Sequence, residues 1–190
     1  DSIIHRGPDT GGQWTDSKSG IALGFRRLAI IDLTQKGHQP MLSGNKRYAM
    51  VFNGEIYNFQ TLKEELDKSI IFKGSSDTEV LLNLLEQRDL NVLNRLRGMF
   101  AFAYCDTSTD ELLLVRDQIG IKPLYYHIND DRIFFSSEIK AILSDKDYEV
   151  GVDEEALKEH ILLGLSLEDR TIFKGIRRLK PGHLLKVTKK

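Results

Sequence analysis

Two consecutive apolar segments constrain the fold of this chain more than any other feature. Residues 98–104 read Gly-Met-Phe-Ala-Phe-Ala-Tyr, residues 112–115 read Leu-Leu-Leu-Val, and the polar turn 107–110 lies between them. A strand that is apolar at every position is buried on both faces, whereas a strand with one wet face alternates. The two segments therefore predict a hairpin in a sheet that is covered by helices on one side and by another sheet on the other.

Helical periodicity appears in short stretches between the predicted strands. Phe59, Leu62 and Leu66 recur at helical spacing, and the segment 76–79 (Ser-Asp-Thr-Glu) matches a capping box in front of an apolar helical face. Antiparallel hairpins with helices between them, and no internal repeat or linker, predict an α+β domain in several layers. The remaining expected elements are helices over 91–96, over 138–143 and after Asp153, a hairpin over 124–135, and strands over 21–31 and 70–72.

Composition and charge exclude several classes of function. The chain of 190 residues has a formal net charge of −1, which gives no electrostatic reason to expect a nucleic acid or a membrane as partner. No apolar run approaches the roughly 20 residues that span a bilayer. The single cysteine, Cys105, excludes an internal disulfide, suits a reducing cytoplasmic location and is predicted to be buried and structural. The histidines lack metal-ligand spacing, so no metal site is predicted.

The dipeptide Asn53-Gly54 follows the β-prone run 47–52 and admits two interpretations. Asn-Gly favours tight turns because both residues tolerate positive φ, so one interpretation is a plain strand connection. In the other, the side-chain amide of Asn53 and the backbone N–H of Gly54 are two donors that converge at a strand end, as an oxyanion hole requires. The dipeptide alone favours the turn, whereas the motifs in the rest of the chain favour the oxyanion hole.

A series of motifs runs in a fixed order along nearly the whole chain. They are His5-Arg6-Gly7-Pro8-Asp9, the segment 24–32, Gln39-Pro40-Met41, the segment 53–58, the segment 76–79, the segment 98–102, the segment 116–126, the segment 136–140, the segment 170–176 and Pro181-Gly182-His183. In this order and number they resemble the amino-terminal glutaminase domain of glutamine-dependent asparagine synthetase, a class II glutamine amidotransferase.

The resemblance implies a fold and a domain arrangement. The expected fold is the four-layer αββα sandwich of N-terminal-nucleophile (Ntn) hydrolases. Residues 1–165 would form the amidotransferase domain, and residues 166–190 would lead to a synthetase domain outside this sequence. The nucleophile of the family is an amino-terminal cysteine. Because position 1 is Asp1, the expectation is an N-terminally truncated chain that lacks the strand carrying that nucleophile.

The resemblance also assigns roles in a glutamine site. Asn53 and Gly54 match the oxyanion pair, and Arg27 matches the arginine that binds the α-carboxylate, which suits the forked guanidinium. Asp77 matches the acceptor of the α-ammonium group, and Glu55 matches the glutamate beside it. Each of the three charged residues has a plain alternative. Arg27 could be a surface arginine, and Glu55 could be a solvated turn residue. Asp77 could be a carboxylate in the first turn of a helix, where the helix macrodipole stabilises its negative charge.

The implied function is hydrolysis of the glutamine side-chain amide, with release of ammonia for ATP-dependent amidation of aspartate in the C-terminal domain. No cofactor is expected in this domain, whereas ATP and Mg²⁺ are implied for the synthetase domain. The expected partners are glutamine and that domain, with a homodimer left open. The alternatives are a glutamine-binding or scaffold module without catalysis, and an amidotransferase domain that serves a different acceptor.

Overall fold

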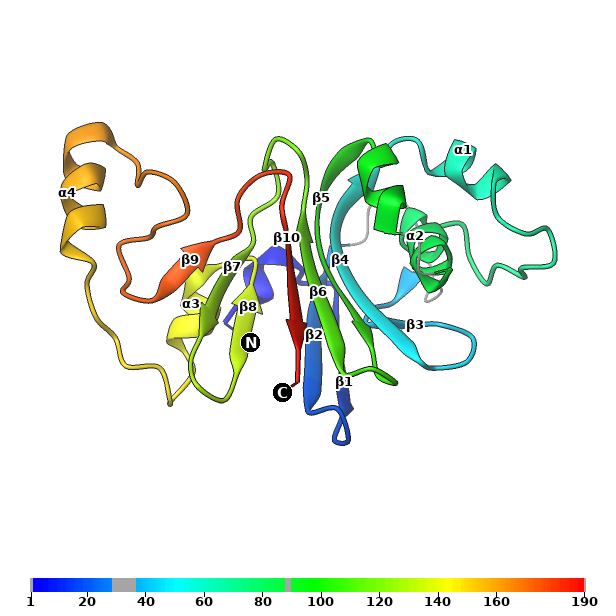
Figure 1. Ribbon diagram of the computed structural model, residues 1–190, viewed down its shortest axis with the longest axis horizontal. Helices are drawn as coiled ribbons and strands as arrows, with labels where there is room; N and C mark the ends of the chain where they lie inside the picture. The colour runs from blue at the N-terminus through cyan, green and yellow to red at the C-terminus, as the bar shows by residue number, and fades with distance from the viewer. Residues whose placement is uncertain (1, 29–36, 88–89, 190) are drawn as a thin grey trace.

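The computed structural model describes residues 2–28, 37–87 and 90–189. Its helices and strands follow one another along the chain as drawn in Figure 1. They are η1 (Ile4–Arg6), β1 (Thr10–Asp16), β2 (Ile21–Arg27), β3 (Met41–Leu42), β4 (Tyr48–Ile56), α1 (Phe59–Glu64), α2 (Asp77–Glu86), η3 (Leu90–Arg95), β5 (Gly98–Asp106), β6 (Glu111–Arg116), β7 (Tyr125–Ile128), β8 (Ile133–Ser136), α3 (Ile139–Leu143), α4 (Glu154–Leu163), β9 (Ile176–Arg178) and β10 (Leu184–Thr188).

The strands form one large sheet and two smaller ones. The large sheet has the order β10-β6-β5-β4-β3, with every neighbouring pair antiparallel. Its centre is the pair β4 and β5, which runs from Tyr48 opposite Asp106 to Ile56 opposite Gly98. The smaller sheets are β8-β7-β9 and the hairpin β1-β2. The hairpin predicted from the two apolar segments is therefore confirmed as β5–β6.

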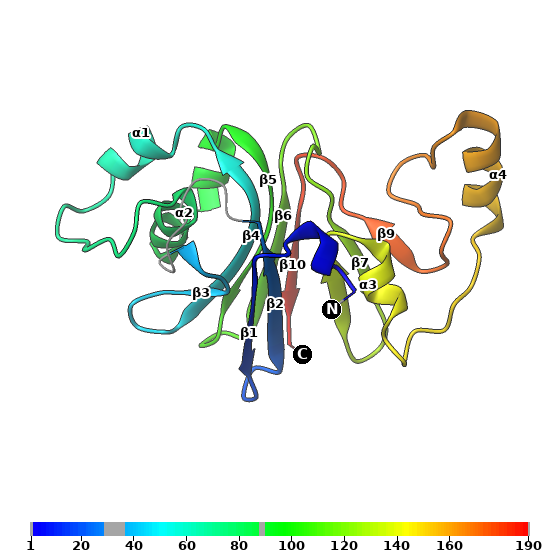
Figure 2. The same cartoon turned by 180° about the vertical axis from the view of Figure 1, so that it is seen from behind.

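Opposite faces of the large sheet belong to different cores, which sets the order of the layers. On one face Phe52 packs in a cluster with Leu81 of α2. On the other face small residues such as Ala103 meet the smaller sheets, represented by Leu23 of β2. A third cluster around Ile142 of α3 covers the far side of β7–β8–β9. The layers are therefore, in order, the helices around α2, the large sheet, the two smaller sheets and helix α3. The expected αββα sandwich is confirmed (Figures 1 and 2).

The structure overturns one local prediction and excludes one of the two interpretations of Asn53-Gly54. Residues 70–72 form no strand, and Ile71 is 90% exposed, because an apolar triplet without a pairing partner gains nothing from an extended conformation. Asn53-Gly54 is not a turn, because β4 continues through both residues and keeps its ladder with β5 as far as Ile56. Long-range pairing overrides the local preference of Asn-Gly for turns here.

The start of α2 confirms the predicted cap and corrects one detail of it. Ser76 is the N-cap, and its Oγ accepts the backbone N–H of Glu79 at 3.2 Å. In a capping box the Glu79 side chain would reach back to the N-cap. Instead its carboxylate accepts the N–H groups of Lys73 and Gly74 at 2.7 and 2.8 Å, and so holds the loop before the helix.

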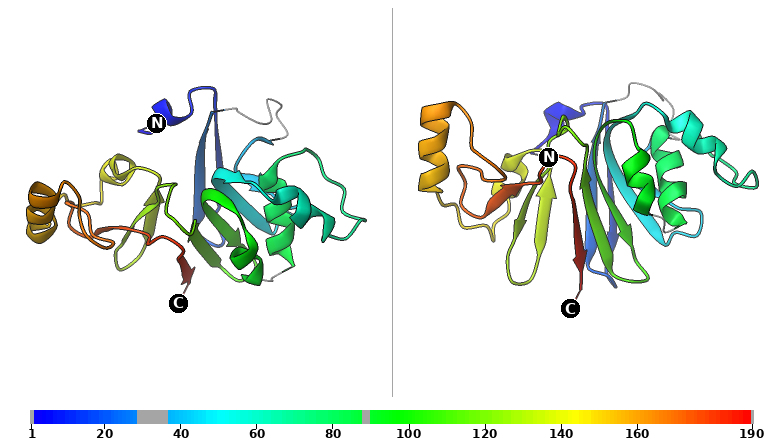
Figure 3. Two further views of the ribbon diagram at one scale, coloured as in Figure 1. Left: turned by 90° about the horizontal axis from the view of Figure 1, so that it is seen from above. Right: turned by 45° about the horizontal axis from the view of Figure 1, so that its top comes forward.

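The last part of the chain contributes to both layers of sheet. β9 pairs with β7, and β10 pairs with β6 along the edge of the large sheet. Residues 176–188 therefore complete the sandwich itself, and whether they also lead into a following domain stays a prediction. The helix predicted after Asp153 is α4, which lies at one end of the molecule with Ala156 as its buried residue (Figures 1 and 3).

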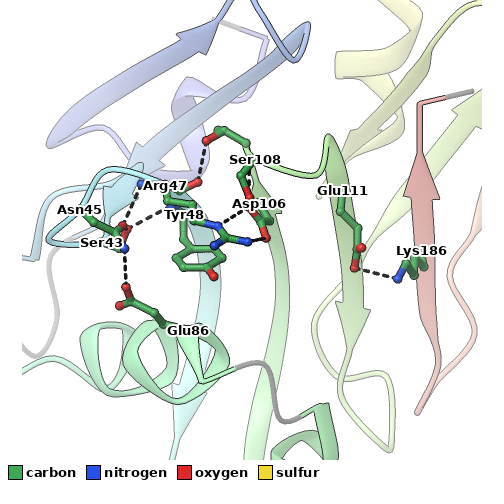
Figure 4. A network of polar contacts seen from close by, with 10 residues as sticks. Ser43, Asn45, Arg47, Tyr48, Glu86, Asp106, Ser108, Glu111 and Lys186 are labelled. Carbon is green, nitrogen blue, oxygen red and sulfur yellow. Dashed lines mark hydrogen bonds and ion pairs between the residues drawn. The ribbon is translucent and has the colours of Figure 1, made fainter.

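A polar network fixes the beginning of β4, at the end of the strand remote from Gly54 (Figure 4). The guanidinium of Arg47 donates to both carboxylate oxygens of Asp106, at 2.7 and 2.6 Å. The Oγ of Ser43 accepts the N–H of Tyr48 at 3.0 Å, which closes the β3–β4 connection. These contacts tie the start of β4 to β5 and to β3, while the register of the strand follows from its nine-residue ladder with β5.

Candidate functional site

All five residues predicted to form the site line one cavity of about 390 Å³. Arg27 comes from the end of β2, Asp77 from the first turn of α2, and residues 53–55 from the second half of β4. These elements meet because β2 lies in the second layer, over the face of the large sheet opposite α2. Ser137, directly after β8, closes another part of the wall.

The edge of β4 beside the cavity is only partly covered by a neighbouring strand. β3 pairs with Ala49 and Met50 and then ends. Beyond it, the N–H of Phe52 donates to the side-chain oxygen of Gln39 at 2.6 Å, and the N–H of Ile56 donates to Asp77 Oδ2 at 2.8 Å. Hydrogen-bonding direction alternates along an antiparallel strand, so the N–H of Gly54 points outward on the same edge.

Contacts on the far side of β5 support this direction for the Gly54 N–H. Gly54 lies opposite Phe100, whose own N–H and C=O both bond to Asp117 on the side away from β4, at 3.2 and 2.8 Å. Phe100 and Gly54 therefore exchange no ladder bonds. Gly54 has φ of +154°, and a Cβ built on it would lie 2.1 Å from the carbonyl oxygen of Met99. Only glycine fits this position while the ladder stays intact.

The side-chain amide of Asn53 is the second donor at this wall. Its Nδ2 donates to the Oγ of Ser137 at 3.4 Å, a long hydrogen bond that joins β4 to the second layer. Asn53 and Gly54 are half-buried and both border the cavity. The two donors are thus presented by a continuous strand, whereas the sequence suggested a strand end.

Asp77 is a buried carboxylate without a counter-charge in the parts of the chain that the structure describes. It is 8% exposed and accepts the N–H groups of Ile56 and Thr78, each at 2.8 Å. Burial raises its pKa above the ordinary aspartate value, despite those hydrogen bonds, and nearby Glu55 adds to the rise. A bound cation would stabilise the ionised carboxylate, so the site suits an ammonium group.

Arg27 and Glu55 are half-buried at the rim of the same cavity. The start of β1 holds the backbone of Arg27, because Arg27 pairs with Thr10 and its carbonyl accepts the N–H of Asp9 at 3.2 Å. The groups that line the cavity thus include the guanidinium of Arg27, the two carboxylates of Glu55 and Asp77 and the two neutral donors of β4, and these match the groups of a free amino acid with a side-chain amide. The roles of the individual residues stay predictions.

Sequence reasoning missed several lining residues, of which Gln39 is the most informative. The Gln39-Pro40 motif was visible, but nothing in it indicated that the glutamine side chain bonds to β4. Arg6 also lines the cavity and contacts Glu138 at 3.3 Å, while His5 contacts the same carboxylate at 2.8 Å. These bonds hold the first loop against the start of α3.

Cys105 does not belong to the site. It is 0% exposed within β5, and burial raises the pKa of its thiol to about 11. Such a thiol stays protonated and unreactive, which agrees with its predicted structural role. Within residues 2–28, 37–87 and 90–189, no cluster of His, Cys, Asp and Glu is placed to hold a metal ion. The described helices include none with the length and apolar character needed to cross a membrane.

The chain is similar to several larger curated proteins. It is 39% identical over 181 residues to asparagine synthetase [glutamine-hydrolyzing] 1 of Bacillus subtilis, covering 95% of this chain and 28% of that protein. It is also 39% identical to a putative asparagine synthetase [glutamine-hydrolyzing] of Mycobacterium tuberculosis, covering 94% and 29%. Amidase chry2 of Gibberella zeae is 34% identical, with 97% and 27% covered. The chain thus spans less than a third of the length of these relatives.

Solved structures of amidotransferases share the fold. Glutamine phosphoribosylpyrophosphate amidotransferase from B. subtilis matches with a TM-score of 0.60 at 26% identity, covering 88% of this chain and 32% of the other. A structure described as the allosteric regulatory enzyme of purine biosynthesis matches with a TM-score of 0.61 at 27% identity, covering 88% and 33%. A family model described as "Glutamine amidotransferase domain" matches residues 1–190. With this fold and this coverage, the chain belongs to the family of glutamine amidotransferase domains.

Proposed function

We propose that this cavity binds free L-glutamine and that the domain releases ammonia from its side-chain amide. The observation that carries the proposal is the gathering of Arg27, Asp77 and the Asn53-Gly54 pair in one cavity wall. The guanidinium of Arg27 binds the α-carboxylate through two parallel hydrogen bonds. Asp77 accepts the α-ammonium group, with Glu55 beside it. In this proposal the carboxamide of the substrate points toward the two neutral donors of β4.

In the proposed reaction a thiolate attacks the carboxamide carbon, and the carbonyl oxygen becomes an oxyanion. Asn53 Nδ2 and Gly54 N–H stabilise this charge, and a donor in such a position contributes about 2.7–4 kcal/mol. The nitrogen takes up the proton that the thiol gave up and leaves as ammonia, and water then hydrolyses the thioester to glutamate and the free thiol. Since Cys105 is sealed in the core, the attacking cysteine is proposed to lie outside residues 1–190, as the family resemblance implies.

We propose further that the ammonia serves the ATP-dependent amidation of aspartate in a C-terminal synthetase domain, in a cytoplasmic asparagine-forming ligase. Support comes from the printed names of the synthetase relatives and from their much greater length. ATP and Mg²⁺ would act in that second domain. The second candidate function is an amidotransferase domain whose ammonia serves an acceptor other than aspartate, and the similarity to a protein named as an amidase favours it.

The test is an assay of glutamate and ammonia formation from L-glutamine by the full-length protein. We expect turnover in the wild type and a loss of about 100-fold or more in kcat for Asn53→Ala. The matched control is Asn45→Ala, which removes an amide that lies remote from the cavity and bonds Glu86. A wild type that binds glutamine but never forms glutamate would instead indicate a binding or scaffold module. Equal turnover in Asn53→Ala and wild type would overturn the oxyanion assignment.

A further inference from the structure

The open edge of β4 is closed by a side chain directly beside the Gly54 donor. The Oε1 of Gln39 accepts the N–H of Phe52 at 2.6 Å, and its Nε2 donates to the C=O of Phe52 at 3.2 Å. Gln39 is 6% exposed, and Phe52 is 4% exposed. This pair of bonds is the one that a residue of a neighbouring antiparallel strand would make with Phe52.

The register of β3 explains why a side chain takes this place. Met41 lies opposite Met50, so a continued strand would bring residue 39 opposite Phe52 and residue 37 opposite Gly54. The backbone of residue 37 would then accept the N–H of Gly54 and remove it from the cavity. The chain instead leaves the strand direction before Met41, and Gly37 lies in the cavity wall. The side chain of Gln39 satisfies Phe52 while the Gly54 donor stays available.

We propose that Gln39 is a positioning residue for amide hydrolysis, an inference that rests on the function proposed above. Its two hydrogen bonds hold Phe52, and Asp77 holds Ile56, so the intervening Gly54 is fixed from both sides. A donor that is fixed in advance stabilises the developing oxyanion without reorganisation. Gln39 therefore acts on the chemical step through Gly54, and its loss lowers kcat more than it weakens glutamine binding.

The test compares Gln39→Met with the wild type in glutamine hydrolysis by the full-length protein. Methionine keeps the length of the side chain and removes both hydrogen bonds to Phe52. We expect kcat to fall about 10- to 100-fold, because small displacements at a reacting centre have effects of this size. KM for glutamine should change less than about threefold, since Arg27 and Asp77 are untouched. A Gln39→Met variant with the same kcat as an active wild type would overturn the proposal.

The matched control is Ser43→Ala. Ser43 is also buried and also accepts a backbone N–H of β4, that of Tyr48 at 3.0 Å, but at the end of the strand remote from Gly54. The Ser43→Ala variant should lose folding stability, as Gln39→Met does, because a buried hydrogen bond is removed. Its kcat should stay within about twofold of the wild type, because the lost bond lies away from Gly54. An equal fall of kcat in both variants would contradict a specific positioning role.

Gln39→Glu gives a second measurement that does not depend on the fate of the methionine variant. An ionised carboxylate accepts the N–H of Phe52 but repels its carbonyl oxygen, whereas a protonated carboxyl group both accepts and donates, as the amide does. The ratio of kcat between this variant and the wild type should therefore rise as pH falls. A ratio that stays flat overturns the proposal. A wild type without glutaminase activity overturns the proposed function itself, so the two failures are distinguishable.

Discussion

The carboxylate of Asp77 accepts the backbone N–H of Ile56 at 2.8 Å, which ties the first residue of α2 to the last residue of β4. One oxygen of the proposed ammonium acceptor is therefore bonded to the strand that carries Asn53 and Gly54. The proposed ammonium acceptor and the proposed oxyanion donors are thus directly connected across two layers of the sandwich. The plain alternative, a helix-start carboxylate, holds at the same time, because Asp77 also lies in the first turn of α2.

The raised pKa of Asp77 predicts a pH dependence of glutamine binding. The α-ammonium group binds the ionised carboxylate, so affinity should fall as pH drops through the pKa of Asp77, which lies above the ordinary value. The same shift lowers the stability of the ligand-free protein as pH rises from the unfolded-state pKa, about 3.9, to the folded-state pKa. Calorimetric titration across pH measures the first effect. In Asp77→Asn the pH dependence should disappear, and its persistence would assign it to another group.

Gly54 and Gly98 form a matched pair for testing the donor at Gly54. Both have φ of +154°, and in each a Cβ would lie 2.1 Å from a carbonyl oxygen of the partner strand. Gly54→Ala and Gly98→Ala should each lose about 1–3 kcal/mol of unfolding free energy through backbone strain. Gly54→Ala acts on the donor residue itself, whereas the Cβ in Gly98→Ala presses on the carbonyl of Glu55, the next residue along β4. We therefore expect kcat to fall about 100-fold in Gly54→Ala and to a smaller extent in Gly98→Ala. Similar kcat values in the two variants would argue against a role for the Gly54 N–H.

Asp117 stabilises the strand behind the site and should govern part of the acid stability. It is 1% exposed, and burial raises its pKa, but N–H donors from Lys122, Ile121, Gly120 and Phe100 outweigh burial and hold the pKa below the ordinary value. A lowered pKa contributes stability that is present above about pH 3.9 and is lost as pH falls toward the folded-state pKa.

Asp117→Asn removes the charge that these donors share, and should reduce the free energy of unfolding by about 2–4 kcal/mol. Urea unfolding at neutral and acidic pH measures the difference, which should shrink as pH falls through the window given above. A difference that is the same at both pH values would show that the charge of Asp117 is not what the N–H groups stabilise.

The sequence predicted the layers well because they follow from burial on both faces. The strands β5 and β6 are continuously apolar and hence lie inside the sandwich, whatever their partners. The predicted role of the Ser76 cap was also confirmed, because an N-cap depends on residues three positions apart. Both signals are local, so a single sequence contains them.

Features that depend on distant pairing escaped prediction. The Asn-Gly preference for turns was outweighed by the ladder with β5, which fixes Gly54 opposite Phe100. The bonds from Gln39 to Phe52 and from Asn53 to Ser137 join residues that are 13 and 84 positions apart. Neither sequence spacing nor composition encodes such contacts. The gathering of Arg27 with Asp77 in one cavity was anticipated only through the family resemblance.

The central claim is that one cavity recognises the head group of free glutamine, and the most direct measurement is calorimetric titration of the full-length protein with L-glutamine. Arg27→Ala and Asp77→Ala should each weaken binding by about 2 kcal/mol or more, because each leaves a charged partner without its counter-charge. The control Arg47→Ala removes an ion pair with Asp106 outside the cavity and should leave the affinity unchanged. Equal affinities in Arg27→Ala, Asp77→Ala and the wild type would contradict the account.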